Sequence, residues 1–138
     1  METTHTLSMM ERILFLRRVH LFADLVPADL KQIAGIATER VYLHGEVLAT
    51  QGEPGHEMYI IVSGEIRVLV NSENGGPVEL ARTRTGDYVG EMAIISQEER
   101  MASLVAAGDV RTLCINQKQF ERILRERPET SLAVMRVL

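Results

Sequence analysis

The chain has few aromatic residues and no excess of positive charge. It contains no Trp, three Tyr and three Phe among 138 residues, and its formal net charge is -4. A protein that binds single-stranded nucleic acid needs ring faces on which bases stack, and a general nucleic-acid or membrane-surface binder needs a basic field. The composition therefore argues against both classes, although a local positive site is still possible.

Cysteine and long hydrophobic runs are also scarce. The one cysteine, Cys114, lies in an apolar run and cannot form an internal disulfide, so we expect a buried thiol and a reducing, cytoplasmic location. No stretch reaches the roughly 18 to 20 apolar residues of a membrane span, and the N-terminus lacks a basic region followed by a hydrophobic segment. We expect neither export nor membrane insertion.

Catalytic and metal-binding patterns are missing too. The histidines, His5, His20, His44 and His56, show no i,i+4 spacing and no cysteine partner, so we expect no zinc site. There is no G-x-S-x-G motif and no P-loop motif. The sequence therefore predicts a protein that is not an enzyme and that has no metal or catalytic cofactor.

The apolar pattern predicts one domain over residues 1–138, mainly β with flanking helices, because a chain of this length closes around a single core. Helical spacing marks residues 8–37, with separate helices at about 8–19 and from Pro27 onward, and residues 117–138. Pro27 suits the first turn of its helix, and Val26 before it cannot act as a side-chain cap. Asn116 can cap the first C-terminal helix, and Pro128 is expected to interrupt it.

Residues 39–115 show short β-prone runs with turn residues between them, the pattern of an eight-stranded β jelly roll, or double-stranded β-helix. Gly64 is expected to make a tight reversal between two runs, and the segment 74–77, Asn-Gly-Gly-Pro, to form a looser hairpin loop. The predicted strands are 40–43, 46–49, 57–62, 65–70, 78–83, 88–89, 102–106 and 111–115.

The segment 86–104 has the features of an anion pocket. A strand ends at Gly90, a helical turn is expected to begin at Glu91, and Arg100 follows as the next strand starts. The N-terminus of a helical turn offers unpaired N–H groups, glycine allows a close backbone approach, and arginine adds charge-assisted hydrogen bonds to phosphate. Glu91 would repel phosphate but can accept a hydrogen bond from a ribose hydroxyl. This pairing favours a nucleotide.

These residues resemble the phosphate-binding cassette of cyclic nucleotide-binding domains, the sensor module of CRP-like regulators, protein kinase A regulatory subunits and cyclic nucleotide-gated channels. The family pattern is roughly F-G-E-x-A-L, a variable loop, then P-R-x-A-x-V, and Gly90, Glu91, Ala93, Arg100 and Ala102 match it. Upstream, Gly52, Tyr59-Ile60-Ile61 and Gly64 resemble the family's G…Y-I-I-x-x-G, and Leu21-Phe22…Leu25 resembles its helical entry motif. The resemblance covers about residues 10 to 125.

The resemblance implies a role for each matching residue. Glu91 would hold the ribose 2′-OH and Arg100 the exocyclic phosphate oxygens, while backbone N–H groups near Met92 and Ala93 would bind phosphate. The pocket would be lined by Ala102 or Ser103.

The sequence departs from the family pattern at three positions. Val89 replaces the usual Phe. Glu99 replaces Pro, where its carboxylate can compete with phosphate for Arg100. Met101 stands where members that prefer cGMP often carry Thr, and a thioether is a poor partner for the guanine amino group, so cAMP is favoured.

Each site residue also has a simpler interpretation. Alone, Glu91 is a favourable first-turn carboxylate and Arg100 a solvated charge at a strand end. The functional hypothesis is a sensor that binds cAMP without altering it and passes the signal to its C-terminal helices. Its effector would be a domain of a longer parent chain or a partner protein, and a homodimer could form through the C-terminal helix.

Two other hypotheses are a degenerate roll that no longer binds nucleotide and serves as an interaction or dimerisation module, and a metal-dependent cupin-type enzyme. The second lacks its His-x-His…Glu…His cluster.

Overall fold

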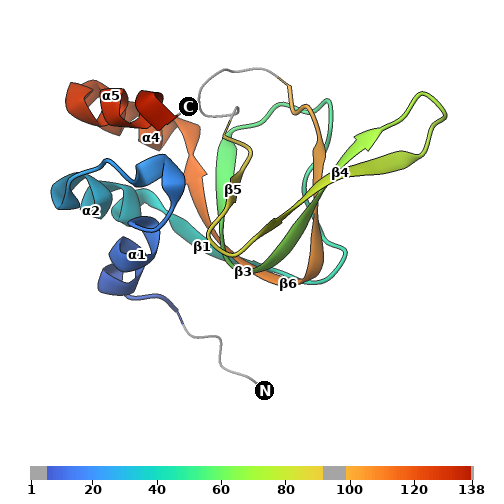
Figure 1. Cartoon of the computed structure of the whole chain (residues 1–138), viewed down its shortest axis with the longest axis horizontal. Coiled ribbons are helices and arrows are strands. Elements are labelled where there is room, and N and C mark those ends of the chain that lie inside the picture. The colour runs from blue at the N-terminus through green and yellow to red at the C-terminus, as the bar shows by residue number, and fades with distance from the viewer. Residues whose placement is uncertain (1–5, 92–98, 138) are drawn as a thin grey trace.

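The computed structural model describes residues 6–91 and 99–137. Its helices lie together at one end of a β-roll, and the β3–β4 hairpin projects at the opposite end (Figure 1). The chain runs through α1 (Met9–Leu16), a 3-10 turn (His20–Phe22), α2 (Pro27–Ile36), β1 (Thr38–Tyr42), β2 (Val47–Ala49), β3 (Glu57–Asn71), β4 (Pro77–Arg84), β5 (Tyr88–Val89), β6 (Ser103–Asn116), α4 (Gln117–Glu126) and α5 (Pro128–Val137).

The strands form one antiparallel sheet that is organised around β3 and β6. The order is β1-β6-β3-β4, while β2 pairs with β6 and β5 pairs with β3. The β3–β6 ladder runs from Glu57 opposite Asn116 to Leu69 opposite Ser103. The mainly β fold with flanking helices is therefore as predicted.

The strand count and the role of Gly64 differ from the prediction. The eight predicted runs all lie in described residues, where they form six strands, because 57–62 and 65–70 merge into β3 and 102–106 and 111–115 merge into β6. Gly64 makes no reversal: it has a φ of 96° inside β3, and the ladder shifts register between Ile61 and Ser63 and between Ser63 and Glu65. These irregularities bend the strand instead of ending it.

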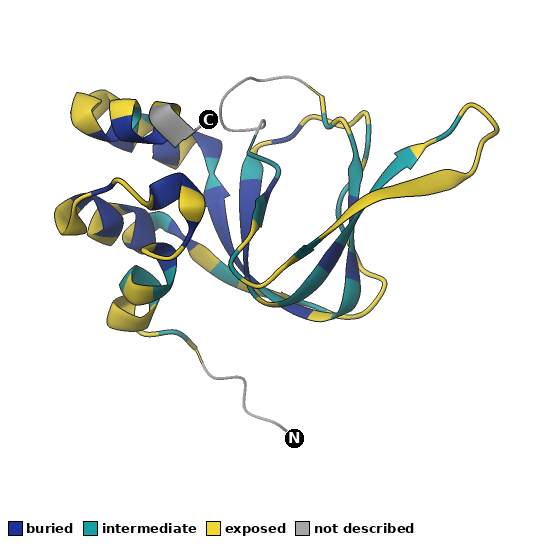
Figure 2. Cartoon of the chain, in the orientation of Figure 1, coloured by how far each residue is buried: buried dark blue, intermediate teal, exposed yellow. Residues whose placement is uncertain are grey.

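Two hydrophobic clusters lie on opposite faces of β3 and β6. Met58 and Ile60 face the helices and pack in the cluster that contains Phe22 and Phe120, whose ring centroids are 6.4 Å apart. Tyr59 and Ile61 belong to the cluster inside the roll. Figure 2 shows this burial between helices and roll, and a β4 that is mostly exposed. The run Tyr59-Ile60-Ile61 is therefore buried on both faces, as core strands require.

The N-terminal helices begin as the sequence indicates, but the first is shorter than the predicted 8–19. Ser8 and Glu11 form a capping box at α1, which ends at Leu16 before the 3-10 turn. Pro27 opens α2, and Val26 makes no side-chain cap. Because α2 lacks that cap, its start depends on packing, and buried Leu30, Ile33 and Ala34 supply it.

The C-terminal helices also follow the sequence. Asn116 Oδ1 accepts from the backbone N–H groups of Lys118 and Gln119, and Pro128 separates α4 from α5. Arg127, at the junction, forms an ion pair with the buried Asp29 of α2. This contact ties the α4–α5 junction to the N-terminal helices.

Removal of the α4 cap is expected to destabilise the fold modestly. Asn116→Ala deletes the acceptor of two otherwise unpaired N–H groups, and the expected loss is about 1 kcal/mol in the free energy of unfolding, measured with urea. Lys118→Ala, at an exposed position of the same helix, is the control and should stay within about 0.5 kcal/mol of the parent. Equal losses in both variants would contradict the capping role.

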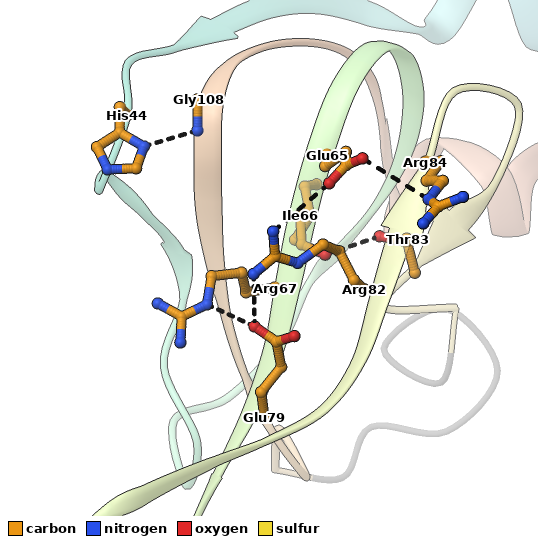
Figure 3. A network of polar contacts seen from close by, with 9 residues as sticks. All are labelled: His44, Glu65, Ile66, Arg67, Glu79, Arg82, Thr83, Arg84 and Gly108. Carbon is orange, nitrogen blue, oxygen red and sulfur yellow. Dashed lines mark hydrogen bonds and ion pairs between the residues drawn. The ribbon is translucent and has the colours of Figure 1, made fainter.

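The projecting hairpin carries a network of exposed ion pairs (Figure 3). Glu79 accepts from Arg67 and Arg82, and Glu65 pairs with Arg82 and Arg84. Hydrogen bonds from Arg82 and Arg67 lower the pKa of Glu79. Such solvent-exposed pairs contribute little to stability, so the network mainly makes this edge of the sheet polar.

Candidate functional site

The predicted cassette residues lie around a cavity of about 280 Å³ at the end of β5 and the start of β6. Met92 and Ala93 lie outside the described residues. Of the other predicted residues, Gly90, Glu91, Arg100, Met101 and Ala102 all line the cavity. The remaining lining residues are Val68, Tyr88, Val89, Glu99 and Leu104.

Ser103 has a different position. Its Oγ accepts from the backbone N–H of Gln51 at 2.9 Å, and it is not among the residues that line the cavity. Its side chain therefore ties the start of β6 to the loop after β2. Ala102, beside it, is the residue that reaches the cavity wall.

The backbone of Arg100 is fixed on both sides by the loop between β2 and β3. Its N–H donates to Glu53 O and its carbonyl accepts from Gly52 N–H, both at 2.8 Å, next to the bridge between Pro54 and Glu99. This pairing brings Gly52, 48 positions away in the sequence, next to Arg100.

The guanidinium of Arg100 is held by neutral groups. Its Nη2 donates to Glu57 O at 2.8 Å, and its Cζ lies 5.6 Å from the centre of the Tyr59 ring. Its Nη1 is buried and has no hydrogen-bond partner among residues 6–91 and 99–137. A buried guanidinium N–H without an acceptor is costly, so this atom is the natural donor to an anionic ligand.

Gly90 is required where the backbone approaches that atom. It has a φ of 79°, and a Cβ there would lie 2.5 Å from Arg100 Nη1 and 3.3 Å from Glu57 O. Any side chain would displace the guanidinium in addition to straining the backbone. The glycine predicted for a close approach to ligand thus also makes room for the arginine.

The described residues of the cavity carry two carboxylates and one guanidinium. Glu91 is half-buried and Glu99 is exposed, and neither forms an ion pair with Arg100 within the described parts of the chain. The pKa of the Tyr88 phenol is raised by burial and by the charge of Glu91. Because no carboxylate of residues 6–91 and 99–137 forms an ion pair with Arg100, none of these groups competes with an anionic ligand for its charge.

The walls of the cavity are largely apolar. Val68, Val89 and Leu104 come from β3, β5 and β6, and Met101 lies at the rim with 73% of its surface exposed. A pocket that has apolar walls and, among its described residues, the cation of Arg100 and the carboxylates of Glu91 and Glu99 suits a ligand that combines a flat apolar group, a hydroxyl and a single anionic group.

Sequence reasoning missed several residues of this site. The sequence places Tyr59 in the predicted strand 57–62 and Val68 in the predicted strand 65–70 and indicates no role at the site for either, whereas the Tyr59 ring contacts Arg100 and Val68 lines the cavity. The available signal was the alternation in β3, which puts Tyr59 and Ile61 on the inner face and Met58 and Ile60 on the other. The alternation does not predict which other segment packs against that inner face.

Comparison with known proteins gives a match to the cyclic nucleotide-binding domain over residues 39–127. The chain belongs to this family. The cAMP-dependent protein kinase regulatory subunit of Blastocladiella emersonii is 33% identical over 110 residues, which are 80% of this chain and 27% of the subunit. The chain thus spans about a quarter of the length of the curated relatives it matches.

Solved structures agree on the fold of this cyclic nucleotide-binding domain. The regulatory domain of Toxoplasma gondii protein kinase A with cAMP aligns with a TM-score of 0.81 and 25% identity over 93% of this chain and 49% of that one. The N-terminal domain of a transcriptional regulator from Streptomyces coelicolor aligns with a TM-score of 0.82 and 26% identity over 89% and 86%.

One similar structure is a triple mutant bound to cAMP in its A site, and the kinase to which it belongs is described as cAMP-independent. The regulatory subunit of a cAMP-independent protein kinase A from Trypanosoma brucei aligns with a TM-score of 0.78 and 26% identity over 85% of this chain and 43% of that one. In the described part of the chain, no helix is long and apolar enough to cross a membrane.

Proposed function

We propose that this domain is a sensor that binds cAMP in preference to cGMP, without altering it, in the cavity lined by residues 88–91, 99–102 and 104. The observation that carries the proposal is the buried Nη1 of Arg100, which lies beside Gly90 on the cavity wall and has no partner among the described residues. A cyclic phosphate supplies the missing acceptor and is small enough to sit at one guanidinium.

The other groups take roles that follow from their chemistry. Glu91 accepts a hydrogen bond from the ribose 2′-OH, and the backbone N–H groups of Met92 and Ala93 complete the phosphate contacts. Ala102 packs against the nucleotide, while Ser103 acts through its bond to Gln51. The thioether of Met101 at the rim is only a weak hydrogen-bond acceptor for a guanine amino group, which favours adenine.

The signal is proposed to leave through the C-terminal helices. β6 begins at the cavity and ends at Asn116, the cap of α4, so one strand connects both places. The effector is a domain of a longer parent chain or a partner protein. Leu132 and Met135 of α5 are exposed apolar residues, which supports contact of this helix with an effector or with a second copy of the domain.

The non-binding interaction module is the rival function. It predicts a filled or neutralised site, whereas this cavity is open and its arginine lacks a carboxylate partner in the described residues. The sensor is therefore the better supported of the two. A cytoplasmic location stays a prediction from the single, buried Cys114.

Isothermal titration of the whole chain with cAMP and with cGMP tests the proposal. We expect one site per chain, tighter binding of cAMP, and a rise in melting temperature with cAMP, because a ligand that binds only the folded state stabilises it. If millimolar concentrations of either nucleotide gave no heat and no thermal shift, the sensor function would be wrong.

Glu91→Gln is expected to weaken cAMP binding about tenfold, because the hydroxyl then bonds to a neutral oxygen instead of a carboxylate. Glu99→Gln is the matched control, since it removes an equal charge from an exposed position on the same cavity and is expected to hold or raise the affinity. Titration of both variants with cAMP measures the two affinities. An equal loss of affinity in both would contradict a specific contact at Glu91.

A further inference from the structure

The side chain of Arg100 runs through a narrow gap between two glycines. A Cβ on Gly55 would lie 2.8 Å from both Cδ and Cζ of Arg100, and one on Gly90 would lie 2.5 Å from its Nη1. Gly55 has no positive φ, so its backbone does not require glycine, and its missing side chain is explained by the space that Arg100 occupies. The absence of a side chain at Gly55 therefore leaves space for the side chain of Arg100.

Tyr59 forms the floor of the same gap. Its ring lies 5.6 Å from Arg100 Cζ, within the range of a cation–π contact. The ring is itself fixed: it is 2% exposed, its hydroxyl donates to Leu48 O at 2.9 Å, and it meets the Tyr42 ring edge-on. Burial raises the pKa of the Tyr59 phenol above its ordinary value, so the hydroxyl keeps its proton and remains a hydrogen-bond donor.

We propose that Gly55 and Tyr59 are positioning residues, which with Gly90 and the Glu57 carbonyl form a slot that aligns Arg100 before ligand arrives. The inference rests on the proposed function for the identity of the ligand. It adds the residues that allow a single arginine side chain to bind the phosphate. Arginine has many rotamers, and ordering it in advance removes that entropy cost from binding.

In the slot, one nitrogen of the guanidinium is left to donate a hydrogen bond to a ligand. Nη2 is used by Glu57 O, one face is covered by Tyr59, and Nε is enclosed by Gly55. Nη1 is the atom without a partner in the described residues, and it lies against Gly90 on the cavity wall.

Titration with cAMP of four single variants tests the slot. Tyr59→Phe keeps the ring and is expected to bind within about twofold of the parent, whereas Tyr59→Leu is expected to bind about tenfold more weakly. Gly55→Ala should also lose about tenfold, because the methyl group displaces Arg100. Gly76→Ala, another glycine without a positive φ but with open space around it, is the control and should bind normally.

A double-mutant cycle distinguishes positioning from general damage. In an Arg100→Lys background the planar fork is absent, so Tyr59→Leu and Gly55→Ala should each cost less than about threefold. Equal losses in both backgrounds would overturn the proposal. If Tyr59→Leu does not fold, Gly55→Ala carries the test alone.

NMR of the ligand-free chain makes the test independent of the proposed function. The Nε–H signal of Arg100, assigned by its absence in Arg100→Lys, is expected to be shifted by the Tyr59 ring in the parent and in Tyr59→Phe, and unshifted in Tyr59→Leu. An unshifted signal in the parent would refute the slot whatever the ligand. A shifted signal in a chain that binds no cAMP would support the slot and reject the proposed function.

Discussion

Arg100→Ala is expected to reduce the affinity for cAMP by at least about 100-fold, which is the size of effect seen when one partner of a buried, hydrogen-bonded charge pair is removed. The variant loses the one cationic donor that the described cavity offers and leaves the phosphate with backbone groups only. Titration calorimetry measures the loss, and a melting curve shows that the domain remains folded.

The control for this variant is Arg84→Ala, which removes the same charge from an exposed position on β4, outside the cavity. It should change the affinity by less than about twofold, because an exposed charge at that position is screened by solvent and salt. An unchanged affinity in Arg100→Ala would mean that the nucleotide binds elsewhere on the domain.

Gly64→Ala is expected to cost about 3 kcal/mol or more in the free energy of unfolding. The residue has a φ of 96°, and a Cβ would lie 2.5 Å from Asp109 O and 3.0 Å from Val110 Cα, both of them backbone atoms of β6. Backbone strain and the clash each contribute about 1 to 3 kcal/mol, and the ladder cannot move aside without loss of its pairing.

Gly108→Ala separates these two contributions. Gly108 also has a positive φ, 82°, but a Cβ there would meet no atom within 4 Å, so the expected cost is about 1 kcal/mol from the backbone alone. Urea unfolding of both variants gives the comparison. Equal costs would show that the close contact of Gly64 with β6 has no energetic weight.

Much of the site could be predicted because its key residues are close together in the sequence. Gly90, Glu91, Arg100, Met101 and Ala102 fall within 13 positions, and all of them line the cavity. A local motif of this kind can be recognised in the sequence even when the strand pairing is unknown. The roles of Met92 and Ala93 stay predictions, because both lie outside the described residues.

The neighbours of Arg100 could not be predicted in the same way. Gly55, Glu57 and Tyr59 lie more than 40 positions earlier, and they meet Arg100 because the loop after β2 pairs with residues 99–100, just before β6. A local pattern contains no information about this register, which depends on the whole sheet.

The sequence by itself determined the helix boundaries at Pro27, Asn116 and Pro128, the strand that contains Tyr59-Ile60-Ile61 and the grouping of residues 90–91 and 100–102, because each depends on neighbouring residues. Only the tertiary structure decided that Gly64 bends a continuous β3 instead of reversing it. The hydrogen bonds and buried side chains along the β3–β6 ladder together outweigh the local turn preference of one glycine. That same long-range pairing places Arg100 against Gly55, Tyr59 and Gly90, and so makes a local motif into a site.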